Sequence, residues 1–350
     1  MPRYALTIAY DGTDFCGWQK QEPPIGPATA GMRAGMVLGE KDARRQDAEP
    51  AGAEGTGGER RLILRTVQEV VERAVREVVR EPVILVGVSR TDAGVHAVGQ
   101  VGAFTCGDGA GGLGWPIERG LDRLVMAINS RLPGDVAVTA ARVVEGAFDP
   151  IADAVRKRYT YTFVSPRVGA GSMVDRTAAS REATDAESAA HAIARGWVSP
   201  RMVREVFERN YVHETWHALD AERMNDAARH LVGTHDFASF AALGHGRESA
   251  VRTVFRCEVR EESRRSAGDE PGARDAWAGM SRIVMTIEGG GFLYNMVRII
   301  AGTLEEVGRG KIEPDAAKEI LAARDRTRAG PTAPAKGLRL ERVWYADEAE

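Results

Sequence analysis

The order of strand-like and helical patterns constrains this chain more than any other feature, because the same order occurs twice. In the first half, segments that alternate apolar and polar residues, as half-buried strands do, are interleaved with segments whose apolar residues recur at helical spacing. The expected strands are 3–10, 83–88, 98–105 and 136–144, and the expected helices are 67–79 and 119–130. The helix at 67–79 has the strongest signal, because Thr66 and Glu69 form a capping-box pattern ahead of a stripe of valines.

The second half of the chain repeats the order β-α-β-β-α-β with one additional helix. Its expected strands are 157–164, 251–260, 282–288 and 338–345, and its expected helices are 221–232, 292–307 and a third that starts at Pro314. This order is the split β-α-β, or ferredoxin-like, arrangement. We therefore expect an α+β protein with two ferredoxin-like halves, 1–150 and 151–350, whose strands form one extended, mainly antiparallel sheet with a central cleft where the halves meet.

Insertions rich in glycine, alanine, serine and charged residues interrupt this pattern at about 23–61, 166–208 and 262–278. They contain too few apolar residues to build a core of their own. The tip of the first, AEPAGAEGTGGE, is expected to be mobile, and all three are interpreted as surface elaborations.

Composition and charge restrict the class of protein. With 43% hydrophobic residues among 350, the chain can build a sizeable core, and no stretch approaches the length of a membrane span. The net charge is −3, whereas a dedicated nucleic-acid binder is usually basic, so any nucleic-acid contact is expected from a local basic surface. Cys16, Cys106 and Cys257 lie far apart and form no CxxC pair, which argues against a disulfide framework or a thiolate metal site. These features, with an N-terminus unlike a signal peptide, favour a cytoplasmic protein.

The most informative stretch is GVSRTDAGVH, residues 87–96. It follows a buried strand and carries Arg90 and Asp92, with Gly94 allowing a tight turn. A loop held by rigid strands commonly presents a catalytic group. Taken alone, however, the stretch is more often an ordinary Asp-Ala-Gly turn with a solvated arginine, since aspartate and glycine are common turn residues.

Seven further motifs accompany this one, and together they resemble the tRNA pseudouridine synthase A (TruA) family. The motifs follow in the family's order as YDGTDFCGWQKQ, SRTDAGVHAVGQV, RLPGDVAV, RKRYTYTF, LDAERM, GTHDFASF, FLYNMVRIIAGTLEEVGRG and TAPAKGLRLERVWY. Eight ordered segments are far more specific than a single motif. The chain departs from the family at Phe148-Asp-Pro-Ile151, where a His-Ala-Arg run is usual, and any RNA contact from that segment is therefore in doubt.

The resemblance implies a role for several residues. Asp92 matches the catalytic aspartate, and Arg90 matches an arginine that helps to hold the target nucleotide in a flipped position. Tyr159 matches the tyrosine that contacts the target base, and Arg298 matches the arginine paired with the catalytic carboxylate. An RNA-contacting loop of the family resembles the segment that contains Trp18, Gln19 and Lys20.

Two of these assignments compete with structural explanations. Tyr159, Tyr161 and Phe163 share one face of a strand, so all three are also consistent with core packing. We expect Phe163 to be core, and Tyr161 is a rival to Tyr159 for the base contact. Arg298 lies among apolar residues of its helix and could extend to water, although an arginine in such surroundings more often has a carboxylate partner.

The implied reaction explains why these residue types occur together. Isomerisation of uridine to pseudouridine breaks a C–N glycosidic bond, turns the base and joins C5 to the same sugar carbon. Nothing is oxidised and nothing leaves, so the resemblance implies no cofactor and no metal. An ionised carboxylate is required, to attack the sugar or the base or to remove a sugar proton, and a cation such as Arg298 would favour that ionised form. The target must also leave the base stack.

By resemblance, the substrate is the anticodon stem-loop of tRNA, at uridines in tRNA positions 38 to 40, and the enzyme is a homodimer. One alternative is a non-catalytic RNA-binding protein on the same scaffold. Another is a zinc protease, because residues 213–217 read His-Glu-Thr-Trp-His and fit HExxH. The protease is disfavoured, since Asp220 and Arg223 occupy the next places of the longer metzincin pattern and no apolar helix leads into the motif.

Overall fold

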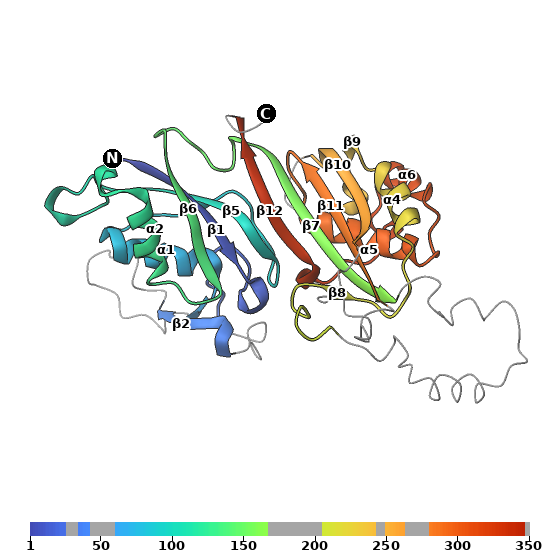
Figure 1. Cartoon of the computed structure of the whole chain (residues 1–350), viewed down its shortest axis with the longest axis horizontal. Helices are drawn as coiled ribbons and strands as arrows, with labels where there is room; N and C mark the ends of the chain where they lie inside the picture. The colour runs from blue at the N-terminus through green and yellow to red at the C-terminus, as the bar shows by residue number, and fades with distance from the viewer. Residues whose placement is uncertain (26–33, 43–59, 167–204, 243–248, 263–279, 347–350) are drawn as a thin grey trace, which may run out of the picture. The chain divides into compact units, whose positions relative to one another are not determined.

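The computed structural model describes the chain except residues 26–33, 43–59, 167–204, 243–248, 263–279 and 347–350. The chain divides into two compact units. Figure 1 shows the chain coloured by residue number from blue at the N-terminus to red at the C-terminus. Unit 1 comprises Met1–Val155 and Leu340–Glu350, and unit 2 comprises Arg156–Arg339. The first crossing between the units therefore lies close to the expected boundary at 150, but the last strand returns to unit 1.

Unit 1 contains a mainly antiparallel sheet. In spatial order its strands are β6 (Val136–Val144), β1 (Arg3–Tyr10), β5 (His96–Thr105) and β12 (Leu338–Tyr345), and the short β4 (Val86–Gly87) also pairs with β5. The expected strand 83–88 is thus reduced to two residues. Side chains of the first helix explain this difference, because Arg76 donates to the carbonyl of Val83 and Glu72 accepts from the backbone N–H of Leu85, so these groups form no strand ladder.

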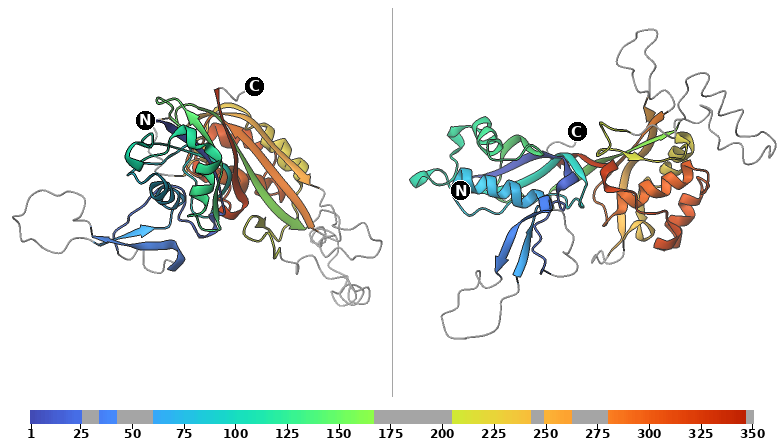
Figure 2. Two further views of the ribbon diagram at one scale, coloured as in Figure 1. Left: turned by 60° about the vertical axis from the view of Figure 1, so that its left-hand side comes forward. Right: turned by 90° about the horizontal axis from the view of Figure 1, so that it is seen from below.

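Two helices, α1 (Val67–Val79) and α2 (Leu121–Asn129), pack against each other and cover one face of this sheet (Figure 2). The predicted cap of α1 is confirmed, since Thr66 Oγ1 accepts a hydrogen bond from the backbone N–H of Glu69 at 3.3 Å. The valine stripe of α1 is buried, as are the side chains of Tyr4, Leu6, Ile8 and Tyr10 on β1. These apolar side chains belong to the core of unit 1.

The first insertion is partly structured. Strands β2 (Val37–Asp42) and β3 (Arg60–Leu64) pair antiparallel, and the backbone N–H of Leu62 also donates to the carbonyl of Pro23. Backbone pairing across the insertion at 23–61 thus supplies order that composition does not reveal. The tip at 43–59, and most of the insertions expected at 166–208 and 262–278, lie outside the described residues.

The strands of unit 2 are also mainly antiparallel. In spatial order its strands are β7 (Ala154–Pro166), β11 (Met280–Gly289), β10 (Val251–Glu262) and β9 (Gly233–Asp236), and β8 (His213–Glu214) pairs parallel with β7. Its helices are α4 (Ala221–Arg229), α5 (Met296–Gly308) and α6 (Ala316–Ala323). Asp220 caps α4, as expected. The helix expected at 292–307 begins at Met296, because Asn295 adopts a left-handed backbone with φ 59°.

Short 3₁₀ helices connect these elements at Gly12–Asp14, Ala34–Met36, Ala110–Gly112, Ile117–Arg119, Ala238–Phe240, Arg326–Arg328 and Ala335–Gly337. The predicted α+β class with mainly antiparallel strands is confirmed. None of the helices in the described part of the chain has the length and apolar character that crossing a membrane requires.

Candidate active site

Asp92 lies in unit 1, on the loop that joins β4 to β5. The loop is tied to the sheet where the backbone N–H of Val88 donates to the carbonyl of Val101 at 2.9 Å. It then turns tightly, with Val95 N–H donating to the carbonyl of Asp92 and Gly94 at φ 79°. Asp92 is half-buried and Arg90 is exposed, so the loop presents a carboxylate and a guanidinium close together at the surface of the unit.

The N-terminal motif clamps this loop from the other side. The backbone N–H of Trp18 donates to the carbonyl of Thr91 at 3.0 Å, and the hydroxyls of Tyr10 and Thr91 lie 2.7 Å apart. Gly17, at φ 89°, approaches so closely that a Cβ there would lie 2.7 Å from the carbonyl oxygen of Thr91. The motifs YDGTDFCGWQKQ and SRTDAGVHAVGQV are therefore two sides of one packed structure, which holds the backbone on both sides of Asp92.

The predicted RNA-contacting residues differ in exposure. Trp18 is 2% exposed, and its indole occupies the space beside Gly87, where a Cβ would lie 2.2 Å from the ring. Lys20 extends along α1, with Nζ 3.0 Å from Glu69 Oε2 and 2.5 Å from Glu72 Oε1. Gln19 alone among the three is exposed. The Trp18 side chain is thus a core element beneath the loop, with almost no surface to offer a ligand.

In unit 2, the aromatic residues of β7 have separate environments. Tyr159 is 6% exposed, and its ring meets that of Phe292 edge to face at 5.3 Å. Tyr161 is fully buried, and its hydroxyl donates to the carbonyl of Pro334 at 2.9 Å. Phe163 is fully buried, which confirms the expectation that it is core. Tyr161 is thus enclosed in the core with its hydroxyl bonded to the protein, whereas Tyr159 keeps a small exposed area.

Arg298 lies in the first turn of α5 and is held by the protein around it. Its Nε donates to the carbonyl of Ala333 at 2.8 Å, and its Nη1 donates to Asn295 Oδ1 at 2.9 Å. The backbone N–H of Ala333 donates in turn to the carbonyl of Arg298 at 3.1 Å. The guanidinium is therefore oriented by specific acceptors rather than merely extended to water, which was the alternative interpretation.

Sequence reasoning missed Asn295 and Ala333 as supports of Arg298. Asn295 lies in the motif FLYNMVRIIAGTLEEVGRG and Ala333 lies in TAPAKGLRLERVWY, so both positions belong to motifs that resemble the family. An asparagine directly before a helix is also a residue type that tolerates the left-handed backbone found at Asn295. The role of the Ala333 carbonyl could not be recognised from the residue type, because any residue except proline presents the same backbone donor and acceptor.

The HExxH pattern does not have the geometry of a zinc site. His213 lies in strand β8 and His217 lies outside any helix, so the two imidazoles do not share a helical face. His213 Nε2 lies 3.1 Å from Glu305 Oε2, and Arg309 Nη2 donates to His217 Nε2 at 2.8 Å. Within the described ranges, no three histidine, cysteine or acidic residues cluster as metal ligands would. The two histidines are instead parts of polar contacts with α5.

Comparison with known proteins gives the family. The family model described as tRNA pseudouridine synthase matches residues 227–346. The tRNA pseudouridine synthase A of Clostridium acetobutylicum is 30% identical over 345 residues, which is 99% of this chain and 100% of that protein. The one from Thermoanaerobacter sp. (strain X514) is 32% identical over 345 residues, with the same coverage. This chain belongs to the tRNA pseudouridine synthase A family.

Membership makes the chain a pseudouridine synthase and therefore an isomerase. A third family member, from Bacillus pumilus, is 36% identical over 284 residues, 80% of this chain and 90% of that protein. The predicted resemblance and the pseudouridine synthase fold are thus confirmed.

Residues 148–151, where the sequence differs from that usual in the family, form a turn capped by Asp149. Asp149 Oδ1 accepts from the backbone N–H groups of Ile151 and Ala152, at 2.7 and 3.1 Å, and these bonds lower the pKa of Asp149. The Phe148 ring packs 4.9 Å from that of Tyr345. The segment therefore serves local structure in unit 1.

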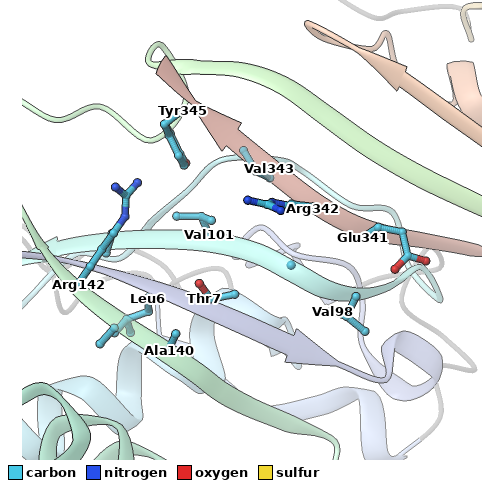
Figure 3. A pocket seen from close by; sticks show the side chains of 13 residues that line it. Leu6, Thr7, Val98, Val101, Ala140, Arg142, Glu341, Arg342, Val343 and Tyr345 are labelled. Atoms are coloured by element: carbon cyan, nitrogen blue, oxygen red, sulfur yellow. The ribbon is translucent and has the colours of Figure 1, made fainter. Parts of the chain in front are cut away.

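A hollow of about 330 Å³ lies on the face of the unit 1 sheet that α1 and α2 leave open (Figure 3). Small residues such as Thr7 and Ala140 form its floor, and Arg142 lies at one end with its guanidinium 5.0 Å from the centre of the Tyr345 ring. None of the predicted site residues lines this hollow. The predicted site residues lie elsewhere, with Asp92 on the clamped loop of unit 1 and Arg298 and Tyr159 in unit 2.

Proposed function

We propose that this pseudouridine synthase converts uridine to pseudouridine in the anticodon stem-loop of tRNA, at tRNA positions 38 to 40, with Asp92 as the catalytic carboxylate and with no cofactor. The loop that presents Asp92 carries this proposal. It is held on both sides of the aspartate, by the N–H of Trp18 and the hydroxyl of Tyr10 on Thr91 and by the ladder bond at Val88. A carboxylate in a rigid surface loop suits chemistry that depends on precise placement of the reacting group.

Arg298 pairs with Asp92 in this proposal and favours its ionised form. The carbonyl of Ala333 and the side chain of Asn295 already orient the guanidinium, so little side-chain entropy remains to be lost when the pair forms. Tyr159 contacts the target base, and the exposed Arg90 helps to hold the flipped nucleotide.

The reaction needs nothing beyond these groups. The bond from N1 of the base to the sugar carbon breaks, the base turns, and C5 bonds to that same carbon. The hydrogen on C5 leaves as a proton and N1 ends the reaction with a proton, so atoms and electrons balance without an oxidant. Attack on the sugar, attack on the base and removal of a sugar proton all begin from the ionised carboxylate of Asp92.

The RNA contact beside the active site comes from Gln19 and Lys20. Gln19 is exposed, and the partly exposed Lys20 forms ion pairs with Glu69 and Glu72 of α1. The buried Trp18 supports this loop from beneath instead of touching RNA. By family resemblance, the enzyme acts in the cytoplasm as a homodimer.

Pseudouridine mapping of unmodified tRNA transcripts tests the proposal, using purified protein with no metal or nucleotide added. The native protein should form pseudouridine in the anticodon arm, and Asp92→Asn should lose at least about 10³-fold in rate, as expected when a reacting group is removed. Asp14→Asn is the matched control, because Asp14 is an exposed aspartate of the neighbouring motif and should retain activity.

Normal activity of Asp92→Asn would contradict the assignment of the catalytic residue. A folded native protein that binds tRNA and forms no pseudouridine would instead support the RNA-binding function. A loss of activity in Asp92→Asn is assigned to the missing carboxylate only if the variant keeps the unfolding midpoint of the native protein, which is expected because Asp92 is only half-buried.

A further inference from the structure

The segment 329–334 holds Arg298 but has no helix or strand of its own. Its contribution is the Ala333 carbonyl, which accepts from Arg298 Nε at 2.8 Å. A backbone acceptor orients a guanidinium only if the backbone itself is held in place. The residues that hold 329–334 therefore control the direction in which Arg298 points.

Two long side chains anchor this segment at its two ends. The Tyr161 hydroxyl donates to the carbonyl of Pro334, the residue directly after Ala333, at 2.9 Å. At the other end, Arg326 Nη1 donates to the carbonyls of Gly330 at 2.9 Å and Ala329 at 3.4 Å. The segment is thus fastened from β7 on one side and from the turn after α6 on the other.

Helix α5 also contacts segment 329–334 and supports it. Thr303 Oγ1 accepts from the backbone N–H of Gly330 at 2.9 Å and donates to the carbonyl of Ile299 at 2.8 Å. Gly302 lets the segment approach closely, because a Cβ there would lie 1.9 Å from the carbonyl oxygen of Pro331. The segment therefore rests directly on the helix that carries Arg298.

We propose that Tyr161 and Arg326 are positioning residues of this pseudouridine synthase, which hold segment 329–334 so that the Ala333 carbonyl keeps the Arg298 guanidinium in one orientation. The inference rests on the proposed function, in which Arg298 pairs with Asp92. Neither residue needs to touch RNA for this role. This role also accounts for Tyr161, the second tyrosine of RKRYTYTF. The proposed base contact involves only the first, Tyr159.

Tyr161 is suited to this role because it remains a donor. Burial, together with the negative charge of Glu305, raises the pKa of Tyr161 well above its usual value of 10. The hydroxyl therefore stays protonated across the whole range in which an enzyme of this kind works. Phenylalanine at this position would keep the ring in the core and remove only the hydrogen bond to Pro334.

The test compares Tyr161→Phe with Tyr345→Phe in the tRNA assay. Tyr345 is a matched control, since it is also buried and its hydroxyl also donates to a proline carbonyl, that of Pro150 at 3.2 Å. Tyr161→Phe should lower kcat about tenfold with KM for tRNA within about twofold, because misplacing a catalytic group slows chemistry more than binding. Tyr345→Phe should change neither.

Arg326 provides a second and independent variant. Arg326→Ala should lower kcat to a similar extent, and Arg326→Lys should recover part of the loss by donating one hydrogen bond to the same carbonyls. Arg328→Ala, which removes an exposed arginine of the same turn, should leave kcat unchanged.

A native kcat in Tyr161→Phe would overturn the inference, as would equal losses in both tyrosine variants that follow their unfolding midpoints. Asp92→Asn is measured alongside and separates this outcome from failure of the proposed function. If Asp92→Asn is inactive and Tyr161→Phe resembles the native protein, only the positioning role is wrong. If Asp92→Asn is active, the proposed function itself is wrong.

Discussion

At the scale of single residues, the absence of a side chain at Gly17 allows close packing against the loop proposed to carry the catalytic carboxylate. Gly17 has φ 89°, and a Cβ would lie 2.7 Å from the carbonyl oxygen of Thr91 and 3.2 Å from the backbone nitrogen of Ala93. These atoms flank Asp92, so an added methyl group would push directly on the backbone that presents the carboxylate.

We therefore predict that Gly17→Ala lowers the rate of pseudouridine formation by about 10²-fold, the cost expected of a small displacement of a catalytic group. Gly120→Ala is the control, since Gly120 has nearly the same φ of 91° but no atom within 4 Å of its added Cβ. Both changes should lower the free energy of unfolding by about 1 kcal/mol or more through backbone strain, and only Gly17→Ala should lose activity. Equal rates in the two variants would show that contact with the loop is unimportant.

At the scale of elements, Glu72 joins α1 to two irregular segments. This carboxylate is 1% exposed, and it lies 2.5 Å from Lys20 Nζ, 2.5 Å from Arg76 Nη2 and 2.9 Å from the backbone nitrogen of Leu85. It thereby fastens the N-terminal loop and the segment before β4 to one helix. Both segments lead into the structure that holds Asp92.

Glu72→Gln should lower the free energy of unfolding by about 2 kcal/mol, because a buried carboxylate that receives three donors is lost, although its partly exposed cations can turn to water. Glu69→Gln removes the more exposed partner of Lys20, at 3.0 Å, and should cost less than about 1 kcal/mol. Urea denaturation measures both values. A loss for Glu69→Gln as large as that for Glu72→Gln would contradict the central role of Glu72.

At the scale of the whole molecule, the chain crosses from unit 1 to unit 2 and returns, since Leu340–Glu350 belongs to unit 1. The buried Leu340, Val343 and Tyr345 belong to the strand that pairs beside β5, which follows the loop of Asp92. The net charge of −3 means that binding of a polyanionic tRNA depends on local cations rather than on overall attraction.

The proposed homodimer is a prediction at this scale. Sedimentation at micromolar concentration should give a mass of roughly twice the 37.9 kDa of one chain, because homologous chains of one family commonly share a symmetric assembly. A sample that sediments only at the mass of one chain, while still forming pseudouridine, would show that a single subunit is sufficient.

The sequence alone determined the features that depend on neighbours along the chain. The strand at 338–345 has the predicted limits, the Thr66 cap begins α1, and the Asp220 cap begins α4. Alternation, helical spacing and capping are local, so each can be recognised in a short window. The ordered motifs likewise predicted the family and the residues proposed for its site.

Only the tertiary structure decided the features that arise between residues distant in sequence. The strand predicted at 83–88 is short because side chains from α1 bond its backbone, and Trp18 is buried because Gly87 leaves space for it. The carbonyl of Ala333 accepts from Arg298, and the Tyr161 hydroxyl donates to the neighbouring Pro334, although these partners lie far apart in the sequence. Backbone groups are chemically alike at nearly every residue, so their roles depend on which distant side chain packing brings to them.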